Sequence, residues 1–229
     1  FKALFKNDQA MTVVVSIILV YTSLNICGNL VLYFFRFDVG NDGAYSIFAA
    51  VAFAAQVLVM MVIPLFRKRF SKSQLFISGF IIQIAGFAVI LIMAFAKLYT
   101  PQSWYILCLP GILIYLGYGM LNVIMTIFLS DSVDYGEVMN GTREESVIFS
   151  MQTFTVKLAS GVAVFLAGLV VDWIHLDTAA AVQTQDTLDA LRMWMTIPSV
   201  ILLIVGIFVF KRFYKLDDTR MEEIKSKLS

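Results

Sequence analysis

Lys157 is the residue of this sequence whose position most strongly predicts chemistry. It lies about halfway along an apolar run at 147–171, too deep to reach either membrane surface comfortably. A lysine there costs roughly 2.5–3.5 kcal/mol on insertion scales, so something must compensate its charge. None of the 16 acidic residues lies well inside an apolar run, so an ion-pair partner would come from outside this chain. We favour a cation that faces a hydrated cavity and contacts a solute; a structural ion pair within a helix bundle is the alternative.

The helix face that carries Lys157 has further small and polar residues at steps of three and four: Ser150, Thr153 and Gly161. Gln152 lies at the edge of this face. We expect Gln152 and Thr153 to contact the solute together with Lys157. Small residues in membrane helices usually mark close helix packing, and we favour that interpretation for Ser160, Gly161 and Gly168.

Two other apolar runs carry hydroxyl, carboxamide and aromatic side chains on one face. The first run has Tyr21, Asn25, Gly28 and Asn29, and the fourth has Tyr115, Tyr118, Gly119, Asn122 and Thr126. Such groups suit a sugar, because they hydrogen-bond its hydroxyls and cover its apolar face. They also suit hydrogen bonding between helices, and the pattern leaves both interpretations open. We expect Asn25, Asn29, Tyr118 and Asn122 to line a cavity.

The stretch 131–146, DSVDYGEVMNGTREES, is predicted as a highly charged connection. Its paired carboxylates would suit glycoside hydrolysis, but they follow a membrane run and no acid–base pocket is implied. We interpret Asp131, Asp134, Glu137 and Arg143 as a cytoplasmic gate that pairs with basic loops when the inner side is shut. A solvated turn is the alternative.

The composition places these residues in a membrane. The chain has 229 residues, of which 60% are hydrophobic and 14% charged, against roughly 25% charged residues in a soluble domain. Six apolar runs are long enough to span a bilayer as helices. They lie at about 12–35, 44–66, 75–96, 103–130, 147–171 and 192–210. The net charge of +1 does not point to nucleic acid, and Cys27 and Cys108 are interpreted as small apolar residues.

Basic residues predict the orientation. With the N-terminus inside, 13 of the 17 lysines and arginines fall in inside segments and only Arg36, Lys97 and Arg192 fall outside. This asymmetry predicts cytoplasmic termini, an outside connection at 172–191 and a cytoplasmic tail at 211–229 that serves as a basic anchor. A short surface helix in the tail is the alternative. The chain opens on Phe1, so we expect a piece of a longer protein.

The residues from SDSVDYGEVMNGTREES to Lys157 resemble the glycoside–pentoside–hexuronide:cation symporters, the melibiose-carrier-like branch of the major facilitator superfamily. The shared pattern is Asp-x-Val-Asp-Tyr-Gly-Glu, Gly-x-Arg-x-Glu, Ser-x-Gln-Thr, and a lysine four residues later. The basic turn PLFRKRFSK at 64–72 fits the loop between helices eight and nine. The resemblance implies an all-α membrane bundle in which residues 1–229 form the C-terminal six-helix half of a twelve-helix carrier with nested inverted repeats.

By the same resemblance, Lys157 lies near the sugar and cation sites, and Gln152 and Thr153 lie near the sugar. The coupling cation, Na⁺ or H⁺, would bind mainly in the N-terminal half, with no metal site in this half and no other cofactor. Some relatives have a tryptophan where this sequence has Asn122.

The leading hypothesis is a cell-membrane symporter that moves a sugar or glycoside with Na⁺ or H⁺ by alternating access. Its partners would be the sugar, the lipid bilayer and the N-terminal half. A membrane-embedded serine protease would need a histidine inside the bilayer, whereas His175 lies outside the spans. A channel or scaffold subunit and a half-transporter that works as a homodimer are the alternatives.

Overall fold

The computed structural model describes residues 7–228, and within them the chain is helical with no β-strand. Six helices are long and apolar enough to cross a membrane, which confirms the predicted fold class. They are α2 (Asp8–Tyr33), α3 (Ala44–Phe66), α4 (Lys72–Phe95), α5 (Cys108–Asn140), α6 (Glu145–Trp173) and α7 (Gln185–Phe213). A π-helical segment, η1 (Phe34–Val39), continues α2, a 3₁₀ turn, η2 (Trp104–Leu107), precedes α5, and a short helix, α8 (Asp218–Leu228), ends the chain.

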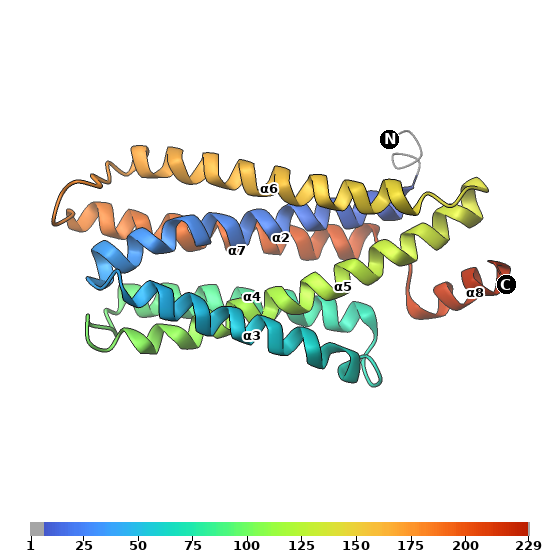
Figure 1. Ribbon diagram of the computed structural model, residues 1–229, viewed down its shortest axis with the longest axis horizontal. Helices are drawn as coiled ribbons and strands as arrows, with labels where there is room; N and C mark the ends of the chain where they lie inside the picture. The colour runs from blue at the N-terminus through green and yellow to red at the C-terminus, as the bar shows by residue number, and fades with distance from the viewer. Residues whose placement is uncertain (1–6, 229) are drawn as a thin grey trace.

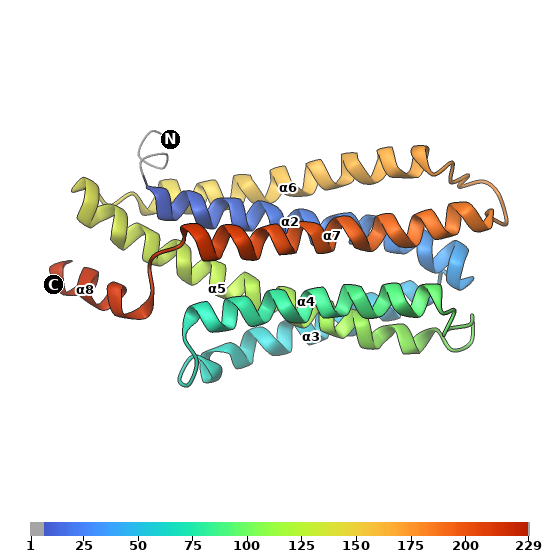
Figure 2. The same cartoon turned by 180° about the vertical axis from the view of Figure 1, so that it is seen from behind.

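The six long helices form two layers of three. One layer contains α2, α6 and α7, and the other contains α3, α4 and α5 (Figures 1 and 2). The largest contacts join α4 to α5 and α2 to α7, followed by α3 to α5 and α2 to α6. If α2, α3 and α4 are exchanged in order with α5, α6 and α7, the α4–α5 contact becomes the α7–α2 contact and the α3–α5 contact becomes the α6–α2 contact. The packing therefore has the inverted-repeat relationship that the resemblance implies.

Glycines and aromatic rings explain the closest helix contacts. A Cβ on Gly117 would lie 2.6 Å from both the backbone nitrogen of Gln83 and the carbonyl oxygen of Gly79. Only glycine allows α4 and α5 to approach so closely. Phe76, Phe80, Phe128 and Phe210 are almost fully buried where α4, α5 and α7 meet, with the Phe76 and Phe210 rings 4.5 Å apart.

The helix of the fourth span continues beyond the apolar run that was predicted to end at about residue 130. Helix α5 continues for ten residues to Asn140, so most of the stretch 131–146 is helix rather than connection. Gly141 ends the helix with φ = +71°, a conformation that glycine adopts without strain. A contact with the start of the chain helps to hold this extension, because Asn7 donates a hydrogen bond of 2.8 Å to the carbonyl of Ser132.

Two further boundaries differ from the sequence prediction. Helix α7 begins at Gln185 and not at 192, and α6 ends at Trp173, so the non-helical part of the predicted connection at 172–191 is only 174–184. The tail at 211–229 contains helix α8, which turns back beside the end of α5 (Figure 1). Leu216, Met221 and Ile224 are buried there, next to Tyr135 and Val138. The tail is thus a docked helix and more than a basic anchor.

Candidate functional site

Lys157 projects from a face of α6 that no other part of the described chain covers. Lys157 and Thr153 are exposed, and Gln152 is half-buried. Lys157 makes no ion pair with any residue between 7 and 228. Thr153 and Ser150 donate to carbonyls of their own helix, over 3.3 Å to Phe149 and 2.9 Å to Val147. This polar face is therefore open to a partner.

The packing interpretation of Gly161 and Gly168 finds no support among residues 7–228. Helix α6 packs against α2 and only slightly against α5, which leaves its opposite side uncovered. A Cβ on Gly161 or on Gly168 would meet no atom within 4 Å. Both glycines instead extend the open face that begins at Ser150.

A second polar group links α2 to α5. Asn122 donates a hydrogen bond of 2.6 Å to the Tyr21 hydroxyl, and the Tyr21 and Tyr118 rings meet edge to face with centroids 5.4 Å apart. Asn25 donates to the Tyr21 carbonyl and Asn29 to the Asn25 carbonyl, each over 2.7 Å. The structure thus brings Tyr118 and Asn122 together at the Tyr21 side chain, one helical turn before Asn25 on α2. No hydrogen bond joins this group to Lys157 within residues 7–228.

A groove of about 550 Å³ runs between α2 and α6. Asn29 and Tyr33 line it from α2, and Gly168 and Asp172 line it from α6. Asp172 lies fifteen residues after Lys157 on a helix with 3.6 residues per turn, so both share the open side of α6. Asn29 therefore faces the same opening as the polar face of α6, closer to the end that carries η1.

The four residues predicted as a gate separate into two groups. Arg143 donates to Glu137 over 2.8 Å, to Asp134 over 3.1 Å and to Glu145 over 3.2 Å. These hydrogen bonds, led by the one to Glu137, raise the pKa of the Arg143 guanidinium above its ordinary range. The group is solvent-exposed, so its ion pairs contribute little to stability. It closes the turn between α5 and α6.

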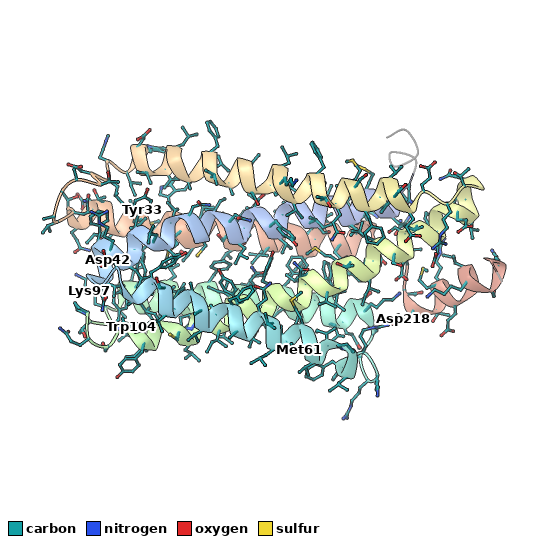
Figure 3. The ribbon with its side chains drawn as sticks, in the orientation of Figure 1. Tyr33, Asp42, Met61, Lys97, Trp104 and Asp218 are labelled. Atoms are coloured by element: carbon teal, nitrogen blue, oxygen red, sulfur yellow. The ribbon has the colours of Figure 1, made fainter. Side chains whose placement is uncertain are left out.

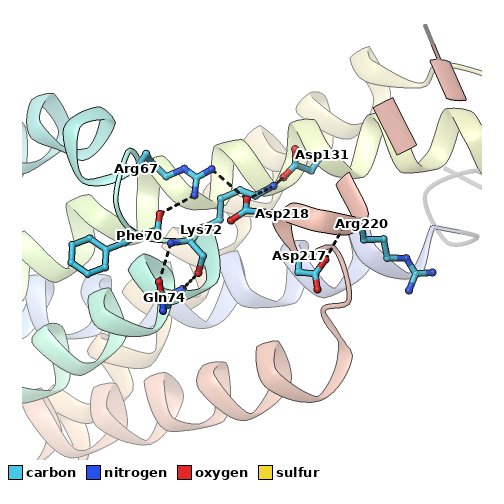
Figure 4. Close-up of polar contacts among 9 residues, drawn as sticks. Arg67, Phe70, Lys72, Gln74, Asp131, Asp217, Asp218 and Arg220 are labelled. Atoms are coloured by element: carbon cyan, nitrogen blue, oxygen red, sulfur yellow. Dashed lines mark hydrogen bonds and ion pairs between the residues drawn. The ribbon is translucent and has the colours of Figure 1, made fainter. Parts of the chain in front are cut away.

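Asp131 belongs to a different and buried group at the same end. Its carboxylate pairs with Lys72 at the start of α4, and both side chains are almost fully buried. Asp218 of α8 lies 3.4 Å from Lys72 and 3.4 Å from Arg67 (Figure 4). Partial burial opposes ionisation of Asp218, but the charges of Lys72 and Arg67 outweigh it and lower the pKa of this carboxyl. Asp131 therefore ties α4 to α5, and α8 covers the pair.

The sequence analysis missed a matching group at the opposite end, which Tyr33, Asp42, Lys97 and Trp104 mark in Figure 3. Arg192 binds both carboxylate oxygens of Asp38, over 2.8 and 2.5 Å, and each side chain is only 3% exposed. Tyr99 donates to the same carboxylate over 2.6 Å. Burial and this hydrogen bond raise the pKa of the Tyr99 hydroxyl, which keeps it a donor. The only hints in the sequence were two charged residues at the ends of apolar runs, Asp38 just after the first run and Arg192 at the start of the sixth.

The comparison with protein families matches residues 1–218 to the family described as MFS/sugar transport protein. The chain belongs to that family. Within the described part of the chain, this family member has no cluster of three histidine, cysteine or acidic residues that would hold a metal ion.

Curated relatives of this MFS/sugar transport protein include carriers and symporters. It is 25% identical to an uncharacterized symporter of Bacillus subtilis, YjmB, over 97% of this chain and 47% of that protein. It is 23% identical to the raffinose carrier protein of Pediococcus pentosaceus, over 100% and 35%, and 25% identical to the isoprimeverose transporter of Lactiplantibacillus pentosus, over 94% and 43%. The chain spans half or less of the length of these three relatives. These matches confirm the resemblance to sugar symporters of the major facilitator superfamily, and none of the three is named as an enzyme.

Proposed function

We propose that this chain is the C-terminal half of a twelve-helix symporter that carries a sugar or glycoside together with Na⁺ or H⁺ by alternating access. The observation that carries the proposal is the uncovered polar face of α6 with Lys157 at its middle. A lysine at that depth cannot remain against lipid without a large energetic cost. The face must therefore meet a second helical unit or a water-filled cavity. Lys157, Thr153 and Gln152 would contact the solute there, with Tyr118, Asn122, Asn25 and Asn29 lining the approach.

Two further features support a carrier. The inverted relationship between α2–α4 and α5–α7 is the internal symmetry found in transporter halves. The relatives are named for raffinose, isoprimeverose and lactose, which favours a small saccharide as substrate. In this proposal both ends of the segment lie in the cytoplasm, and the exposed Arg143 group and the buried Asp131 group lie on the inner side.

Replacement of Lys157 by valine in the complete protein tests the proposal. We expect gradient-driven uptake of raffinose, lactose or isoprimeverose to be lost, while the amount of protein in the membrane stays normal. Leu158→Val is the matched control, because Leu158 is the exposed neighbour one position further along α6. Normal uptake by Lys157→Val with a lowered melting temperature would show that the lysine is structural and would overturn the site.

A homodimer of this chain is the second candidate, because the same uncovered face of α6 could pair with a second copy. Cation-stimulated sugar uptake by the 229-residue chain expressed alone would favour it. We expect no such uptake, since none of the six spans carries an acidic residue near Lys157 to bind a cation. Concentrative uptake that saturates separates either carrier from a channel or a scaffold.

A further inference from the structure

A basic cavity lies between the α3–α4 turn and α8. Its volume is about 450 Å³, and its lining includes Arg67, Lys68, Arg69, Phe70, Lys72 and Lys225. Asp218 and Glu222 of α8 are the acidic residues among its lining. Figure 4 shows the turn and α8 facing each other across the contacts of Arg67 and Lys72 with Asp218. The lining therefore carries more positive than negative charge.

Some basic residues of this cavity have an ion-pair partner among the described residues, and others have none. Lys72 is buried against Asp131, and Arg67 shares Asp218 with it, so these two bases already have partners. Lys68, Arg69 and Lys225 are exposed and make no ion pair with residues 7–228. A ligand with negative charge would find these three bases free, while the buried pairs hold the walls in place.

An apolar surface leads directly into the cavity. Leu65 and Phe66 end α3 with 61% and 44% of their surface exposed, and Met61 one turn earlier is 70% exposed. The rings of Phe66 and Phe70 lie 6.4 Å apart at the rim. Met61 and Asp218 lie toward the same end of the molecule in Figure 3. A membrane-facing apolar strip thus stops where the free bases begin.

We propose that this cavity binds the headgroup of an anionic phospholipid, with its acyl chains along Met61, Leu65 and Phe66. The proposal rests on the cytoplasmic placement of the α3–α4 turn in the proposed function, because the inner leaflet carries the anionic lipids. The phosphodiester accepts hydrogen bonds from Arg69 and is attracted by the positive charges of Lys68 and Lys225. A soluble phosphate would use the bases but not the apolar strip, which is why the combination favours a lipid. The bound headgroup holds α8 against the α3–α4 turn.

Thermal unfolding of the complete protein in detergent tests this proposal without any transport measurement. The probes are phosphatidylglycerol, phosphatidylcholine with the same acyl chains, and glycerol phosphate. We expect phosphatidylglycerol to raise the melting temperature in a saturable way, and the other two to have little effect. The variant Lys68→Gln/Arg69→Gln/Lys225→Gln should need roughly a hundredfold more phosphatidylglycerol, since three lost bases at roughly 1 kcal/mol each remove about 3 kcal/mol of attraction and about 1.4 kcal/mol is a factor of ten.

The triple variant Lys211→Gln/Arg212→Gln/Lys215→Gln is the matched control, because these three bases are exposed at and just after the end of α7 and none of them lines the cavity. It should keep the wild-type response. An equal loss in both variants would show general surface attraction and would overturn the site. A full response to glycerol phosphate would replace the lipid by a soluble phosphate and would equally overturn it. Because unfolding is the readout, a protein that failed to transport sugar would still report on lipid binding.

Discussion

Asp38 and Arg192 form, at one end of the bundle, the inverted counterpart of the ion pair that Asp131 and Lys72 form at the other. The chain has two sequential groups of three helices, α2–α4 and α5–α7. In each pair an acid at the far end of the first helix of one group meets a base near the start of the third helix of the other group. One pair ties α2, through η1, to α7, and the other ties α5 to α4. One layer is therefore fastened at one end of the bundle and the other layer at the opposite end.

The segments that follow α4 and α7 each reach the ion pair of the other layer. Tyr99, four residues after α4, donates to Asp38, and Asp218, five residues after α7, contacts Lys72. The two clusters thus connect both layers of three helices. A six-helix unit fastened in this way is suited to move as one body, as the alternating access that we propose would require.

Loss of the Asp38 carboxylate should destabilise the protein strongly. Asp38→Ala leaves the Arg192 guanidinium buried without its main partner, which typically costs about 3–5 kcal/mol. Asp189→Ala is the control, because it removes the other partner of Arg192. The Asp189 side chain is 40% exposed, so its loss should cost no more than about 1 kcal/mol. Melting temperatures of the two variants compare the losses directly. Equal losses would mean that the buried pair has no special role.

Gly117 should not tolerate a methyl group. Gly117→Ala places a Cβ against backbone atoms of Gly79 and Gln83 that cannot move independently, and overpacking of this kind costs about 1–3 kcal/mol. Gly161→Ala adds the same atom where no neighbour among the described residues lies within 4 Å, and it should lower the melting temperature less than Gly117→Ala does. The close α4–α5 contact would be refuted by an unchanged melting temperature in Gly117→Ala.

Gln83→Leu should stabilise the bundle. Gln83 is fully buried in α4, and neither its oxygen nor its amide nitrogen has a hydrogen-bond partner among the described residues. An unsatisfied buried polar group costs about 1–3 kcal/mol, and leucine of similar size removes that cost. Gln56→Leu, at a half-buried site, is the comparison and should change stability less. A lower melting temperature for Gln83→Leu would reveal a hydrogen-bond partner for the amide.

Single cysteines at Asn140 and Val182 should react with an impermeant thiol reagent from opposite sides of the membrane. Both positions are exposed, Asn140 at the end of α5 and Val182, with 83% of its surface exposed, between α6 and α7. Cys27 and Cys108 are replaced by alanine beforehand. Reaction of both from the same side would contradict the orientation predicted from the basic residues.

The apolar runs and the charged motif determined much by themselves. Six spans, the helical class and the sugar-symporter family follow from local composition and from the residues around Asp134 and Lys157. These features are local, because a spanning helix satisfies its own backbone and needs no distant residue to be recognised. The role of Lys157 in solute binding stays a prediction.

Only the tertiary structure decided which residues meet across the bundle. Asp38 and Arg192 lie 154 positions apart, and nothing in the sequence near either one signals the other. The same holds for Asp131, which the sequence grouped with Arg143 but the fold pairs with Lys72. The physical reason is that helix packing, set by glycines such as Gly117 and by buried phenylalanines, brings distant helix ends together. Side-chain partners at those ends follow from that packing and not from spacing along the chain.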